Sequence, residues 1–132
     1  MISLVDSSAW IEYLRPRGNT KVRAFIRNLL EREEAAVCGI VITEVLRGVK
    51  EDKAFDAVKD TFFALPCLPL GEAEFERAAQ WGRQLHRKGR TLPTTDLLIG
   101  AAAFNRACVL HCDADFVLLG AVTGLKQEYI KG

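Results

Sequence analysis

Short apolar segments rich in β-branched residues alternate along this chain with longer segments whose apolar residues recur every three or four positions. The short segments are typical of buried strands, and the longer spacing is typical of helices that pack one face on a core. Strands that alternate with helices favour a mainly parallel sheet covered by helices on both faces. The sequence therefore predicts an α/β fold, and 132 residues suit a single domain, 1–132.

The boundaries of the expected elements follow from these patterns and from capping and turn residues. The expected strands are Ile2–Val5, Ala35–Gly39, Cys67–Leu70, Ala107–His111 and Lys126–Ile130. The expected helices are Ala9–Leu14, Lys21–Glu34, Thr43–Arg47, Asp52–Leu65, Glu72–Lys88, Asp96–Asn105 and Asp115–Leu119. In the longest helix we expect the core-facing stripe to be Phe75, Ala78, Ala79, Gly82 and Leu85.

Composition excludes several classes of protein. Hydrophobic residues make up 49% of the chain and charged residues 27%, which suits a packed core and argues against disorder. The net charge of +1 gives no overall attraction to nucleic acid, so local patches would have to supply it. The four cysteines lack the spacing of a zinc ribbon or finger, and reduced thiols indicate the cytoplasm. We expect neither a signal peptide nor a membrane span.

Four acidic residues follow strands or begin helices. Asp6 comes directly after the first expected strand and Asp113 directly after the strand at 107–111, whereas Asp96 lies in the first turn of an apolar helix. Glu44 is expected early in the short helix after the second strand. Because open α/β sheets bind ligands at the carboxyl ends of their strands, we expect these acids to share one site. A helix-capping role is the simpler interpretation of Asp96 or Asp113 taken alone, but it explains less well why Asp6 ends a buried apolar run or why Glu44 interrupts an apolar segment.

Converging carboxylates repel one another, so they either hold protons or bind a cation. Ligand sets made only of oxygen suit Mg²⁺ or Mn²⁺, and such an ion can polarise a phosphoryl oxygen and activate water. No nucleophile elbow or glycine-rich phosphate loop offers a competing chemistry, and there are only two histidines. The pattern thus indicates hydrolysis of phosphodiesters at a metal site.

Four motifs, in order, resemble those of PIN-domain proteins, specifically the VapC-type toxins of toxin–antitoxin pairs. The matching segments are Leu4–Ile11, Ile42–Gly48, Thr95–Ala102 and Leu110–Phe116. The resemblance extends over the whole chain. It implies a three-layer α/β/α fold, a homodimer, and a Mg²⁺-dependent endoribonuclease that acts on RNA and is neutralised by a cognate antitoxin.

The resemblance also assigns roles to residues. Asp6 and Asp96 match the family's most dependable metal ligands, Glu44 and Asp113 complete an acidic quartet, and one of the four would orient or activate the attacking water. Many relatives have Thr where this chain has His111. Asp115 is an outside candidate for the fourth acid, since Asp113 and Asp115 are separated by one residue.

Two other functions stay open at this stage: a catalytically inactive PIN-fold dimer that serves as a binding module, and a different metal-dependent phosphohydrolase. The presence of all four acids argues against the first. A cluster of basic residues before Asp96 could hold substrate phosphates or could form a solvated surface. Its members are Arg83, Arg87, Lys88 and Arg90.

Overall fold

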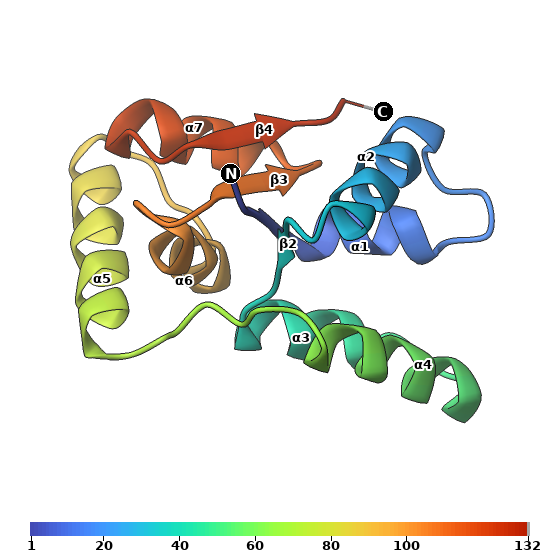
Figure 1. Cartoon of the computed structure of the whole chain (residues 1–132). Helices are drawn as coiled ribbons and strands as arrows, with labels where there is room; N and C mark the ends of the chain where they lie inside the picture. The colour runs from blue at the N-terminus through green and yellow to red at the C-terminus, as the bar shows by residue number, and fades with distance from the viewer. Residues whose placement is uncertain (132) are drawn as a thin grey trace.

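A computed structural model, which describes residues 1–131, contains one four-stranded sheet in which every neighbouring pair is parallel (Figure 1). The strands are β1 (Ser3–Val5), β2 (Ala35–Ala36), β3 (Cys108–His111) and β4 (Gln127–Tyr129), in the spatial order β2-β1-β3-β4. Chain order and spatial order diverge between β1 and β3, because the chain leaves these two strands in opposite directions. This is the switch point at which open parallel sheets bind ligands.

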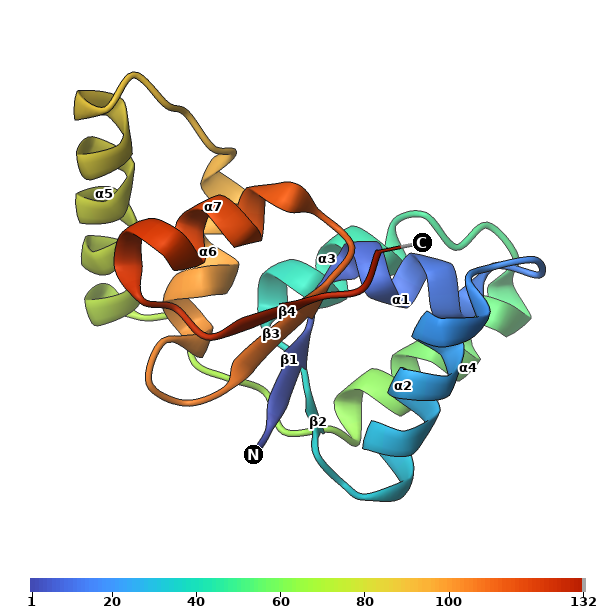
Figure 2. The same cartoon turned by 90° about the horizontal axis from the view of Figure 1, so that it is seen from above.

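Helices cover both faces of the sheet, as expected (Figure 2). Helices α1 (Ser7–Leu14) and α2 (Thr20–Glu31) connect β1 to β2 on one face. Helices α6 (Thr94–Ala103) and α7 (Ala114–Thr123) lie on the other, with α5 (Glu72–Arg87) packed against α6. The remaining helices, α3 (Gly39–Leu46) and α4 (Asp52–Phe63), form an arm that begins beneath the sheet (Figure 1). The predicted α/β fold with a parallel sheet is confirmed.

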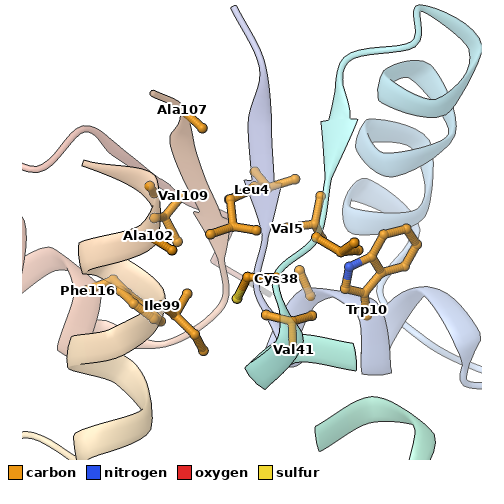
Figure 3. Close-up of a cluster of buried hydrophobic side chains, with 14 of the residues drawn as sticks. Leu4, Val5, Trp10, Cys38, Val41, Ile99, Ala102, Ala107, Val109 and Phe116 are labelled. Carbon is orange, nitrogen blue, oxygen red and sulfur yellow. The ribbon is translucent and has the colours of Figure 1, made fainter. Parts of the chain in front are cut away.

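The core lies where the two helical layers meet the central strands (Figure 3). Leu4, Val5 and Val109 are fully buried in β1 and β3, and Cys38 and Val41 pack below them at the start of α3. Because apolar side chains pack on both faces of β1, Asp6, the residue that follows it, is buried at the edge of the core. Within residues 1–131 no helix is both long enough and apolar enough to span a membrane.

Two expectations about elements are wrong. Cys67–Leu70 is not a strand, because Cys67 makes only an isolated bridge to Val37. Pro66 and Pro69, which bracket this segment, have no N–H to extend a ladder. Glu44 lies late in its helix and not early, because α3 starts at Gly39, directly after Cys38, rather than near Thr43.

The apolar stripe of α5 is rotated from the one expected. Ala78 and Leu85 face the core with Trp81, whereas Phe75 is 50% exposed. Phe75 lines a surface hollow of about 510 Å³ between α5 and α6 together with Ala78, Ala79, Gly82, Thr94, Leu97 and Leu98. The hollow is an exposed apolar patch, which is a common feature of protein interfaces.

Candidate active site

The two acids that follow the central strands occupy equivalent positions. Asp6 follows β1 and is the N-cap of α1, and Asp113 follows β3 and is the N-cap of α7. The Asp6 N–H donates to the carbonyl of Leu110 over 2.9 Å, which fixes the end of β1 against β3. Adjacent parallel strands thus bring two carboxylates from distant parts of the sequence to the same edge of the sheet.

Each of these acids uses one carboxylate oxygen as a helix cap. Asp6 Oδ2 accepts from Ser8 N at 3.0 Å and from Ser8 Oγ at 2.6 Å. Asp113 Oδ1 accepts from Asp115 N at 2.9 Å. Asp6 Oδ1 is buried and has no hydrogen-bond partner among the described residues. A buried carboxylate oxygen without a partner costs free energy, so Asp6 Oδ1 indicates a place where a cation or another ligand binds.

Asp96 lies in the first turn of α6 and faces the same edge. One carboxylate oxygen from each of Asp96, Asp113 and Asp115 lies within 4.8 Å of the other two, close enough for one cation to contact all three. Asp115, the outside candidate, therefore belongs to the same acidic group as Asp113. The two residues are not alternatives, because both lie close to Asp96.

Glu44 comes to the site from helix α3 and not from the end of a strand. Ser7 Oγ donates to Glu44 Oε1 over 2.9 Å and so joins the start of α1 to the end of α3. Beside Glu44 lies a hollow of about 400 Å³ between α1, α3 and α4. Its lining is mainly apolar: Ile11, Leu14, Arg15, Glu44, Val45, Gly48, Val49, Ala54 and Val58.

The acids act on one another electrostatically. The pKa of Asp96 rises from an ordinary 3.8 to about 7, mainly because of burial, with a further contribution from four neighbouring negative charges. These charges belong to Asp6, Asp113, Asp115 and Glu44. Burial also raises the pKa of Asp6, against the hydrogen bonds from Ser8. Without a cation, the Asp96 carboxyl therefore holds its proton to a higher pH than an ordinary aspartate does.

The basic residues before Asp96 are all exposed: Arg83, Arg87, Lys88 and Arg90. The positive charge of Arg90 lowers the pKa of Asp115, although burial and Asp113 raise it overall. Arg90 is therefore the member of this cluster that lies close enough to influence the acids.

His111 is fully buried beside the acids, where the resemblance would place a threonine. Its ring bonds to Asp113 N and to the side chain of Gln127 in β4. Sequence reasoning missed the parts played by Ser8 and Gln127. The Asp-Ser-Ser segment could have indicated Ser8, whereas Gln127 carries no local signal, because only the pairing of β3 with β4 brings it to His111.

Comparison with known proteins agrees with the motifs. The PIN domain family matches residues 3–121. The VapC ribonuclease Mb1587 of Mycobacterium bovis is 34% identical over 128 residues, covering 93% of this chain and 95% of the relative. Ribonuclease VapC18 of Mycobacterium tuberculosis is 32% identical over 135 residues, covering 98% and 96%.

Solved structures share the fold at lower identity. VapBC2 from Rickettsia felis, crystallised with a promoter DNA fragment, superposes with a TM-score of 0.78 at 18% identity, covering 99% of this chain and 100% of the other. VapBC-1 from nontypeable Haemophilus influenzae gives 0.75 at 18% identity, with 98% of each chain covered. The sequence relatives and the matched family together establish that this chain belongs to the PIN-domain family, among the VapC-type toxins.

Proposed function

We propose that this chain is an endoribonuclease toxin that hydrolyses RNA phosphodiester bonds with Mg²⁺ or Mn²⁺ at Asp6, Glu44, Asp96 and Asp113. The observation that carries the proposal is the buried, unpartnered Asp6 Oδ1 beside an Asp96 carboxyl whose pKa is raised to about 7. Oxygen donors crowded in this way suit a hard divalent cation, which relieves their repulsion. The close relatives named ribonucleases supply the substrate class.

The residues present fit such an ion. Asp6, through its unpartnered Oδ1, and Asp96 would hold the ion, with Asp113 offering the oxygen that does not cap α7. Asp115 shares the group of close oxygens with Asp96 and Asp113, and Glu44 adds a negative charge that acts on Asp96. When bound, the ion would lower the pKa of a water and neutralise charge on the phosphoryl group.

The protein's own contribution is orientation. Ser8 holds Asp6 Oδ2 in place, Ser7 holds Glu44 Oε1, and the Asp115 amide holds Asp113 Oδ1. Asp6, Glu44 and Asp113 thus each have one oxygen fixed by the fold, which keeps the remaining oxygen in a constant direction. A carboxylate so fixed can orient an attacking water or accept its proton.

RNA cleavage tests this proposal. The purified chain should cut RNA when Mg²⁺ or Mn²⁺ is added and stop when EDTA removes it. Asp6→Asn and Asp96→Asn should each lower the rate at least about a hundredfold. Asp60→Asn is the matched control, since Asp60 is exposed on α4 and remote from the acids. Cleavage that persists in both site variants would contradict the mechanism. Cleavage of a small phosphate ester but not of RNA would favour a phosphohydrolase, and absence of metal binding would favour a binding module.

We further propose a protein antitoxin as a partner. Solved neighbours of this fold include a toxin–antitoxin complex from Klebsiella pneumoniae and VapBC-5 of Mycobacterium tuberculosis, a member of the VapBC family of toxin–antitoxin systems. The apolar hollow beside Glu44 is the surface that suits such a partner, because Ile11 and Leu14 are 49% and 40% exposed in it. The protein encoded next to this gene, added in excess, should inhibit cleavage. Leu14→Arg should weaken that inhibition and leave cleavage unchanged, and equal inhibition of both proteins would exclude this surface.

A further inference from the structure

His111 is a polar ring that packs against two aromatic rings and is hidden from solvent. It is fully buried at the end of β3, two residues before Asp113. Its ring stacks on Tyr129 of β4, with centroids 5.3 Å apart and planes 10° apart, and contacts Phe116 of α7 at 5.0 Å. An apolar side chain would fill this space, so the two ring nitrogens need a separate explanation.

Both nitrogens are engaged, and their partners fix the tautomer. The backbone N–H of Asp113 donates to Nδ1 over 3.1 Å, so Nδ1 carries no proton. Nε2 then bears the hydrogen and donates to Gln127 Oε1 over 2.6 Å. The ring is therefore neutral. Gln127 of β4 binds one of its nitrogens, and the other nitrogen binds the backbone N–H of Asp113, just after β3.

This bond belongs to a set that fixes the turn between β3 and α7. The Cys112 N–H donates to Ser8 Oγ, the Asp113 N–H to His111 Nδ1, and the Asp115 N–H to Asp113 Oδ1. The first bond anchors the turn to α1 and the last depends on the orientation of the Asp113 side chain. Of these three bonds, the one to His111 is made by the backbone N–H of Asp113 itself, whose carbonyl in turn accepts from the Phe116 N–H over 3.2 Å.

We propose that His111 is a positioning residue: through its Gln127-held, neutral imidazole it fixes the Asp113 backbone, so that the free carboxylate oxygen of Asp113 stays beside Asp96. The effect on RNA cleavage rests on the function proposed above. The effect on the Asp113 backbone and on cation binding rests on the hydrogen bonds alone.

Two substitutions separate positioning from packing. His111→Leu fills the space with an apolar side chain and cannot accept a hydrogen bond. His111→Asn places an oxygen near the position of Nδ1 and so keeps an acceptor for the Asp113 N–H, although it gives up the Gln127 bond. If His111 only packs, the leucine variant should perform as well as the asparagine variant or better.

The measurements are amide hydrogen exchange at Asp113 in the metal-free full-length chain, the Kd for Mn²⁺ by calorimetry, and the rate of RNA cleavage. His111→Leu should speed exchange at Asp113 and raise the Kd about tenfold or more. His111→Asn should stay within about threefold of the wild type in both. Tyr129→Leu, which removes the stacked ring but no hydrogen bond, should leave exchange at Asp113 unchanged.

Wild-type exchange and Kd in His111→Leu, or equal loss in the leucine and asparagine variants, would overturn the proposal. Should His111→Leu fail to fold, Gln127→Met removes the acceptor of Nε2, and unchanged exchange at Asp113 in that variant would overturn it as well. If the wild type cuts no RNA, the proposed function fails, and exchange and Mn²⁺ affinity still decide the positioning role.

Discussion

The Ser8 hydroxyl accepts a hydrogen bond from the Cys112 N–H over 3.0 Å and joins residues 104 positions apart in the sequence. The same oxygen donates its own hydrogen to Asp6 Oδ2 over 2.6 Å. One side chain therefore connects the acid after β1 to the turn that carries Asp113. The two strand-end carboxylates are held as a unit rather than as separate helix caps.

We expect Ser8→Ala to damage both ends of this connection. The Cys112 N–H loses its partner, which should lower the free energy of unfolding by about 1–3 kcal/mol. The hydrogen bonds from Ser8 also hold the pKa of Asp6 down, so their loss should raise that pKa further and let protons compete better with a cation. Urea denaturation and Mn²⁺ calorimetry at about pH 6 and about pH 8 measure the two effects.

Ser8→Thr keeps the hydroxyl and serves as the control. Its Mn²⁺ affinity should stay near that of the wild type, whereas Ser8→Ala should lose more affinity at the lower pH. Equal affinities of the alanine variant and the wild type at both pH values would show that Asp6 does not depend on Ser8.

The raised pKa of Asp96 predicts how stability changes with pH in EDTA. Between its ordinary pKa of 3.8 and the folded value of about 7, the folded chain holds a proton that the unfolded chain has released. The contribution of Asp96 to the free energy of unfolding is therefore largest at low pH, and it is lost as pH rises through about 7. Burial lowers the pKa of His111, which acts in the opposite direction, so the comparison must isolate Asp96.

Asp96→Asn provides that comparison. In EDTA, the variant should gain stability relative to the wild type as pH is raised from about 5 to about 8, because the amide cannot ionise. Adding Mn²⁺ at about pH 8 should stabilise the wild type much more than the variant. Thermal unfolding at each pH measures both effects. If stability changes with pH in the same way in the two proteins, folding does not raise the pKa of Asp96.

Much of the fold is accessible from local sequence. The apolar run before Asp6 predicts a buried strand ended by a helix cap, and the run before Asp113 repeats the pattern, which favours a parallel sheet with both acids at one edge. Periodicity fails where the environment decides. Phe75 fits an apolar stripe on α5, yet Trp81 occupies the core side and leaves Phe75 exposed. The helix with Glu44 starts earlier than capping residues indicate, because Cys38 caps it with backbone alone.

The hydrogen bonds that orient the acids are the part that sequence does not disclose. Ser7 meets Glu44 across 37 positions, and His111 meets Gln127 across 16, through strand pairing and helix packing. A local pattern can indicate which residues are acids and where they emerge. It does not indicate which carboxylate oxygen is already used, because that depends on donors brought in from other elements.

The hollow lined by Phe75 leads to a prediction about assembly. The resemblance to VapC-type toxins implies a homodimer, and the apolar lining of this hollow leads us to expect the second copy on the α5–α6 face. Phe75→Glu would place a charge in an apolar contact and should convert a dimer into a monomer, measured by light scattering after size exclusion. Phe63→Glu is the control, because Phe63 is 67% exposed on α4, outside this hollow. An unchanged mass for Phe75→Glu would place any dimer contact elsewhere.

The turn between α1 and α2 tests the fold apart from the acids. A Cβ on Gly18 would overlap the backbone carbonyl of Glu12, and backbone atoms cannot move aside as a side chain can. Gly18→Ala should therefore lower the free energy of unfolding by about 1–3 kcal/mol. Gly39 has no atom within 4 Å of the same position and begins α3, so Gly39→Ala should raise it by up to about 1 kcal/mol. Denaturant unfolding of the two variants measures the contrast. Equal stability would mean that the α1–α2 turn adapts freely, and the rate of RNA cleavage per folded molecule should be unaffected by Gly18→Ala.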